Sequence, residues 1–155
     1  MKKTEKPIIV EQTFNASVET VWNSITEVHQ MRKWYFNNIP PFKPEAGFET
    51  RFHVQSQNRN FLHIWKITEA IPLKKIAYRW KYEGYPGDSL AVFELFKQGN
   101  STMLRLTHRV LEDFPEDIPE FSRESGVKGW EFLIQKNLKE FLEKTSKDHS
   151  ASGQS

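Results

Sequence analysis

Cysteine is absent from this 155-residue chain, which excludes disulfides, thiolate nucleophiles and cysteine-ligated metals. Long hydrophobic runs are also absent: no stretch approaches the ~20 apolar residues of a membrane span, and none is placed to act as a secretory signal. The 22 basic and 20 acidic residues nearly cancel, leaving a net charge of +2. This balance argues against nucleic acid as a partner. We therefore expect a soluble cytoplasmic protein with no membrane span.

Recognisable catalytic and metal-binding motifs are missing as well. The five histidines show neither HxH nor HExxH spacing, so we expect no metal and no other cofactor. Neither a nucleophile elbow nor a glycine-rich phosphate loop occurs. Enzyme activity is therefore the less favoured interpretation. The class left open is a cyclase- or dehydratase-like reaction on a bound aromatic compound.

One long amphipathic helix is predicted near the C-terminus, over residues 126–144. Its apolar positions recur at steps of three and four residues, which places them on one helix face: Trp130, Leu133, Ile134, Leu138, Phe141 and Leu142. A helix of this length needs a broad apolar surface to cover. The preceding strands can supply that surface.

The rest of the chain predicts an α+β fold. A first strand at 8–14 is followed by a short helix with Ser17 as its N-cap, a further helical turn at 29–36, and a proline-rich connection at 37–47. Alternating apolar residues then predict five strands joined by short turns, at 48–54, 61–71, 75–82, 90–98 and 101–109. Residues 109–125 are predicted to be a connection before the long helix. We expect a strongly curved antiparallel sheet of about six strands wrapped around that helix.

A single domain is predicted over residues 8–144. Residues 1–7 are expected to be a flexible N-terminus, and residues 145–155 a disordered tail. The chain is long enough for one domain with a substantial core, and nothing indicates a second domain.

Large aromatic residues recur on the strand faces that should point toward the helix. Such rings either fill a thick core or line a cavity, and for any single ring the core is the more common outcome. The candidate ligand-binding residues combine these rings with a few helix and polar positions: Trp34, Phe36, Phe52, His63, Trp65, Tyr78, Trp80, Phe93, His108, Trp130, Ile134 and Asn137.

Three of these candidates are polar side chains at apolar faces. His63 and His108 are predicted to face inward from different strands, where they could bind a polar ligand group, act as acid and base, or be core histidines bonded to a neighbour. Asn137 lies near the edge of the buried helix face, where an amide needs a hydrogen-bond partner or contact with solvent.

Several segments together resemble a known family. They are FNASVETVWNSIT followed by Trp34, the stretch from Ile76 to Trp80, the hairpin VFELFKQGNSTMLRLTH, and Gly129-Trp130 opening the amphipathic helix. In order and spacing they resemble the family named for the activator of the ninety-kilodalton heat-shock protein's ATPase, over roughly Ile8 to Leu142. That family belongs to the START-like, helix-grip superfamily, which also includes the birch pollen allergen and aromatase/cyclase proteins.

The resemblance implies the helix-grip fold and, in many members, a cavity between the long helix and the sheet. The expected function is therefore binding of a small hydrophobic, lipid-like or polycyclic aromatic molecule by a monomer. The alternative that the resemblance implies is a stress-related co-chaperone, with a chaperone as partner.

Overall fold

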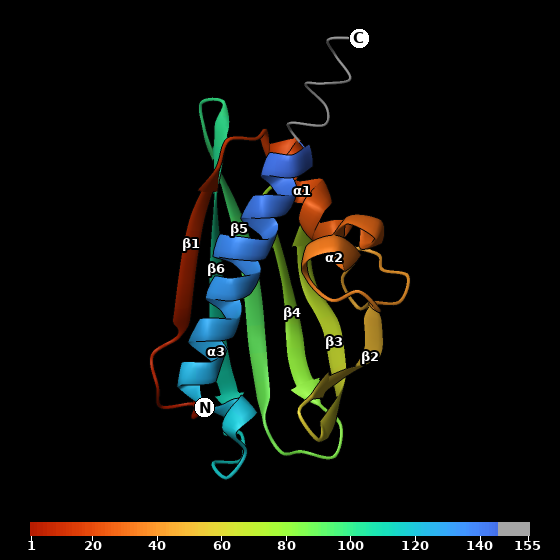
Figure 1. The fold of residues 1–155 in the computed structure, drawn as a ribbon, viewed down its shortest axis with the longest axis vertical. Helices are drawn as coiled ribbons and strands as arrows, with labels where there is room; N and C mark the ends of the chain where they lie inside the picture. The colour runs from red at the N-terminus through yellow and green to blue at the C-terminus, as the bar shows by residue number, and fades with distance from the viewer. Residues whose placement is uncertain (146–155) are drawn as a thin grey trace.

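The computed structural model describes residues 1–145 and has the predicted α+β architecture (Figure 1). The tail predicted for 145–155 lies outside the described residues, except for Thr145. The elements are β1 (Ile8–Phe14), α1 (Val18–Thr26), α2 (Val28–Trp34), β2 (Glu49–Ser56), β3 (Arg59–Ile71), β4 (Lys75–Tyr82), β5 (Asp88–Gln98), β6 (Ser101–Glu112), η1 (Pro119–Phe121), α3 (Arg123–Trp130) and η2 (Glu131–Leu138). The long helix formed by α3 and η2 lies along one face of the sheet, and α1 and α2 pack beside its C-terminal end (Figure 1).

One antiparallel sheet contains all six strands, in the order β1-β6-β5-β4-β3-β2. The chain forms a meander from β2 to β6, and β1 then pairs with β6 at the other edge. Side chains alternate between the two faces, so cross-strand partners such as Trp65 and Trp80 lie on the same face. The predicted curved sheet around a helix is therefore confirmed.

The long helix begins earlier than the sequence pattern predicts. Ser122 caps it, because the Ser122 hydroxyl accepts a hydrogen bond from the Ser125 N–H at 3.1 Å. The predicted connection at 109–125 is also wrong in part, because β6 continues through Glu112 and Pro119–Phe121 forms a 3₁₀ turn. Apolar periodicity could not locate this boundary, since the first turn of α3 is polar.

The middle of the long helix is wound as a π-helix. Hydrogen bonds in η2 run from residue i to i+5, and α-helical winding resumes at residues 139–145. Trp130, Ile134, Leu138 and Leu142 are all buried against the sheet. Every fourth residue thus anchors the helix on the core.

Helix α1 starts at the cap that the sequence predicts. The side chain of Ser17 accepts a hydrogen bond from the backbone N–H of Thr20 at 3.2 Å and donates to the Thr20 hydroxyl at 2.9 Å. Trp34 at the end of α2 then donates from its indole N–H to the C=O of Ser24 at 2.7 Å. The two short helices are therefore held together by a buried hydrogen bond.

Replacing Ser17 with alanine should lower the free energy of unfolding by about 1 kcal/mol, because the first turn of α1 loses its side-chain acceptor. The change is measured by urea denaturation. Ser17→Asp, which keeps an acceptor at the cap, is the matched control and should stay within a few tenths of a kcal/mol of the wild type. Equal losses in both variants would contradict the capping role.

The first residues of the chain contact the segment between β6 and α3. The backbone N–H of Phe114 donates to the C=O of Met1 at 2.9 Å, and the N–H of Lys3 donates to Asp113 at 2.7 Å. The Met1 ammonium also donates to the C=O of Phe121. The predicted flexible N-terminus therefore has defined partners in the structure.

Candidate functional site

A cavity of about 420 Å³ lies between the long helix and the inner face of the sheet. Its wall combines aromatic rings with a small number of polar groups. The lining residues are Met1, Tyr35, Phe36, Ser56, His63, Trp80, Tyr82, His108, Glu120, Ser125, Gly126, Gly129, Trp130, Phe132, Leu133 and Asn137.

Half of the candidate residues line this cavity. They come from the segment after α2, from three strands and from the long helix: Phe36, His63, Trp80, His108, Trp130 and Asn137. The fold thus brings together residues that lie up to 101 positions apart in the sequence, from Phe36 to Asn137. Their contact with a ligand stays a prediction.

The other candidates lie in the packed core, outside the cavity wall. They are Trp34, Phe52, Trp65, Tyr78, Phe93 and Ile134, all of which are buried. Trp65 illustrates the reason, because its ring centroid lies 4.7 Å from that of Phe52 and 4.9 Å from that of Tyr35. Neighbouring rings occupy the space that a ligand would need.

Several wall residues were not among the sequence candidates. Tyr82 shares the inward face of β4 with Trp80, so strand alternation alone could have identified it. Phe132 has no such signal, because it lies off the buried stripe of the helix and is 52% exposed. Gly129 could not be recognised either, since its contribution is the absence of a side chain.

His108 is held in one tautomer by the long helix. The indole N–H of Trp130 donates to Nδ1 of His108 at 3.1 Å, so Nδ1 carries a lone pair and the ring proton of the neutral form lies on Nε2. Burial lowers the pKa of His108 to about 4, which keeps the ring neutral at pH 7. Within residues 1–145, Nε2 is one of four buried side-chain nitrogens without a hydrogen-bond partner.

His63 has the other tautomer, with its proton on Nδ1. Its Nδ1 lies 3.2 Å from the C=O of Phe61, and because a carbonyl only accepts, Nδ1 carries the proton. Burial lowers the pKa of His63 to about 4, with a partial offset from the bond to Phe61. In the cavity wall, Nε2 of His63 is therefore a hydrogen-bond acceptor and Nε2 of His108 is a donor.

Two further polar residues of the wall are Asn137 and Tyr35. The amide of Asn137 donates to the C=O of Trp34 at 3.2 Å, which leaves its own oxygen available. The hydroxyl of Tyr35 lies 2.6 Å from that of Tyr78. Burial raises the pKa of Tyr35, so both members of this pair stay protonated at neutral pH. All these groups suit hydrogen bonding to a neutral molecule.

A second hollow, of about 540 Å³, lies beside the cavity at the surface. The two share five lining residues, Ser56, Glu120, Ser125, Gly129 and Phe132. Beside them, the guanidinium of Arg59 donates to both carboxylate oxygens of Glu120, at 3.1 and 3.3 Å.

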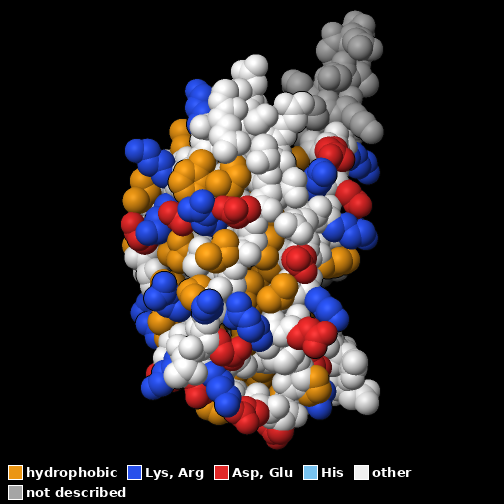
Figure 2. All heavy atoms as spheres, turned by 90° about the vertical axis from the view of Figure 1, so that its left-hand side faces the viewer, with side chains coloured by type: hydrophobic (Ala, Val, Ile, Leu, Met, Phe, Trp, Pro, Cys, Tyr) orange, Lys and Arg blue, Asp and Glu red, His pale blue; other side chains and the backbone are white. Residues whose placement is uncertain are grey.

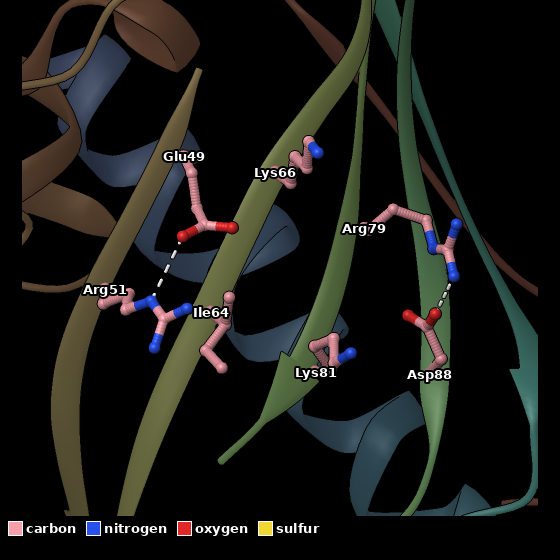
Figure 3. A pocket seen from close by; sticks show the side chains of 7 residues that line it. All are labelled: Glu49, Arg51, Ile64, Lys66, Arg79, Lys81 and Asp88. Atoms are coloured by element: carbon pink, nitrogen blue, oxygen red, sulfur yellow. Dashed lines mark hydrogen bonds and ion pairs between the residues drawn. The ribbon is translucent and has the colours of Figure 1, made fainter. Parts of the chain in front are cut away.

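A separate hollow of about 300 Å³ lies on the outer face of the sheet (Figure 3). Two of its basic groups are paired, Arg51 with Glu49 and Arg79 with Asp88, while Lys66 and Lys81 add positive charge to the same hollow. The basic side chains spread over β2, β3 and β4 without pointing toward a common centre (Figure 3). This face has the character of a solvated charged surface.

The side of the molecule that carries β1 has a mixed surface. Basic and acidic side chains are interspersed there, with small hydrophobic patches between them (Figure 2). In residues 1–145 no helix has the length and apolar character needed to cross a membrane. The same residues contain no cluster of three or more histidine or acidic side chains placed to hold a metal ion.

A curved antiparallel sheet that wraps one long helix, with a cavity between them, defines the helix-grip class of proteins. The chain belongs to the family described as activator of Hsp90 ATPase homolog 1-like proteins, whose model matches residues 15–143. The resemblance seen in the sequence is thereby confirmed. No curated protein matches the chain.

Several solved structures share the fold. Protein CV1439 from Chromobacterium violaceum superposes with a TM-score of 0.74 at 18% identity, covering 89% of this chain and 97% of that one. The Aha1 dimer from Colwellia psychrerythraea has a TM-score of 0.70 at 20% identity, over 89% of this chain and 96% of that one. DynU16, from the dynemicin biosynthetic locus, has a TM-score of 0.70 at 18% identity over 90% of this chain and 48% of that one.

Proposed function

We propose that this protein binds a small hydrophobic molecule, aromatic or lipid-like, in the cavity under the long helix. The observation that carries the proposal is the cavity itself: about 420 Å³ of space bordered by the rings of Phe36, Trp80, Tyr82 and Trp130. Ligand sites in proteins typically have volumes of about 300–1,000 Å³, apolar walls and a few convergent polar groups. The cavity combines these three properties.

Binding is favoured over catalysis by the chemistry of the wall. His63 and His108 are neutral and lack a carboxylate hydrogen-bonded to either ring, so neither is set up as an activated acid–base pair. Among the described residues, the Ser56 and Ser125 hydroxyls of the wall make no hydrogen bond to either histidine ring. These groups can orient a ligand by hydrogen bonds, which is what a binding protein requires.

A titration with lipids, flavonoids and polyketides tests the proposal, with tryptophan fluorescence and amide chemical shifts as readouts. We expect a binding compound to shift the resonances of Trp80, Trp130 and Gly129 together, because all three border the cavity. If no compound shifts them, or if shifts fall only on the outer face of the sheet, the proposal is wrong.

Gly129→Phe should abolish this binding while leaving the fold intact. A Cβ atom built on Gly129 meets no heavy atom within 4 Å, and this position lines both the cavity and the neighbouring surface hollow. A phenyl ring at this position would therefore occupy ligand space. We expect at least a tenfold loss of affinity for any compound that binds the wild type, as measured by fluorescence titration.

Two variants control for helix stability. Gly129→Ala adds only a methyl group and should raise the free energy of unfolding by about 0.5–1 kcal/mol, because glycine is unfavourable inside a helix. Glu131→Phe places the same ring at an exposed position outside the cavity wall, and it should leave the affinity unchanged. Equal losses in Glu131→Phe and Gly129→Phe would contradict a blocked cavity.

A second candidate function is a surface interaction with a chaperone, which the description of the matching family favours. Stimulation of the chaperone's ATPase by the wild type, retained in Gly129→Phe and lost on reversing surface charges, would support it. A chaperone ATPase that does not respond to the protein would exclude it.

We further expect a cytoplasmic monomer. Sedimentation tests the oligomeric state directly, and the test is needed because a solved relative is described as a dimer.

A further inference from the structure

We propose that the ligand is an uncharged aromatic ketone whose carbonyl oxygen accepts a hydrogen bond from Nε2–H of His108. This inference rests on the proposed function and adds the chemical class of the ligand. It follows from a chain of two contacts, Trp130 to His108 and His108 to the cavity.

The hydrogen bond from Trp130 determines whether His108 donates or accepts on its other side. An indole N–H only donates, so Trp130 makes Nδ1 of His108 an acceptor and forces the proton of the neutral ring onto Nε2. His108 therefore presents a donor and no acceptor on its other side. A ligand group that pairs with it must be an acceptor.

This donor has no partner among residues 1–145. Nε2 of His108 is buried and makes no hydrogen bond, although the residue borders the cavity. A buried donor without a partner is costly because it has lost water without replacement. Less than 1 Å² of this atom is exposed, so neighbouring side chains must shift before a ligand oxygen can reach it, as side chains commonly do on binding.

The charges of the wall favour a neutral acceptor over a carboxylate. No lysine or arginine is among the residues that line the cavity, Glu120 contributes a carboxylate to it, and the Met1 ammonium there already donates to the C=O of Phe121. A carboxylate bonded to His108 would lose its hydration without pairing with a lysine or arginine. A ketone carbonyl accepts the same hydrogen bond without that penalty.

The rings of the wall favour an aromatic body for the ligand. The ring centroid of Trp80 lies 6.0 Å from that of His108 and 5.3 Å from that of Trp130. Phe36 continues this surface at 6.2 Å from Trp80. A flat ring system can stack against such a wall while its carbonyl points to His108.

Three probes of nearly the same shape test the inference: fluorenone, fluorene and fluorene carboxylate. The wild type should bind fluorenone roughly tenfold more tightly than fluorene, as expected for one hydrogen bond to a buried donor, and the carboxylate most weakly. The readout is the ratio of the affinities for fluorenone and fluorene, because a general change in packing affects both affinities equally. In His108→Phe this ratio should fall several-fold, although the buried N–H of Trp80, which also lines the cavity and lacks a partner in residues 1–145, stays in place.

Trp65→Phe is the matched control. Trp65 also has a buried indole N–H that finds no partner among the described residues, but it does not line the cavity. We expect this variant to keep the preference for fluorenone. A preference that is lost in Trp65→Phe as well would overturn the assignment to His108.

A measurement on the wild type needs no variant. Nitrogen NMR of the histidine rings should place the proton of His108 on Nε2, and fluorenone should shift that signal while fluorene does not. Equal binding of fluorenone and fluorene would overturn this inference and leave the proposed function standing. If neither compound binds, this inference is overturned, and the lipid and polyketide titration decides the proposed function separately.

Discussion

Trp65→Ala should lower the free energy of unfolding by about 3–5 kcal/mol, the range for truncating a large buried ring. Trp65 is 0% exposed, and its ring contacts Phe52, Tyr78 and Trp80 with centroid distances of 4.7, 4.8 and 5.1 Å. Truncation would leave a void among rings that are held by two strands and cannot close in. Urea or thermal denaturation measures the loss.

Trp65→Phe separates ring packing from the indole nitrogen. The N–H of Trp65 is buried and has no hydrogen-bond partner in the described part of the chain, so its removal relieves an unsatisfied donor while a phenyl ring keeps most of the contacts. We expect a loss well below that of Trp65→Ala. A loss as large in the phenylalanine variant would mean that the indole makes a stabilising contact that these distances do not reveal.

Acidification should destabilise the protein through its two buried histidines. Burial lowers the pKa of both His63 and His108 from 6.5 to about 4 in the folded state. Between these values the unfolded chain binds more protons than the folded one. The contribution of the histidines to the free energy of unfolding is therefore fully present above pH 6.5 and is lost as the pH drops toward 4. At about 1.36 kcal/mol per pKa unit, each histidine removes roughly 3 kcal/mol.

The contribution of each ring can be isolated by substitution. His63→Phe and His108→Phe should each remove about half of the histidine-linked pH dependence between pH 6.5 and 4, measured by urea denaturation at several pH values. His29→Gln changes an exposed ring on α2 and should leave the dependence as it is. An unchanged slope in both buried variants would contradict neutral burial of these rings.

Much of the fold was predictable because its signals are local. Alternation placed Trp80 and Tyr82 on the inner face of β4, and the spacing of Trp130, Ile134 and Leu138 located the buried stripe of the helix. The cap at Ser17 was equally readable. These patterns depend only on neighbouring residues and on the two periods of regular backbone.

The division between core and cavity was not predictable, because it depends on how distant elements pack. Trp65 and Trp80 face each other on paired strands, yet only Trp80 borders the cavity. Tyr35, which follows α2, covers Trp65 and fills the space above it. Strand alternation gives the face of a residue, and it carries no information about what lies opposite.

The polar character of the site was predictable only in part. His63 and His108 were recognisable as inward-facing, but their opposite polarities arise from the Phe61 carbonyl and from Trp130. The latter contact joins residues 22 positions apart through tertiary structure. A sequence pattern can thus nominate a titratable residue without fixing where its proton lies.

The π-helical segment η2 lets the long helix accommodate a change in its number of residues. A helix bonded from i to i+5 holds more residues per unit of rise than one bonded from i to i+4, so losing one residue there can be absorbed by rewinding. Trp130 and Leu142 can then keep their places on either side of the change. Deletion of a single residue in related chains should therefore be tolerated at this part of the long helix.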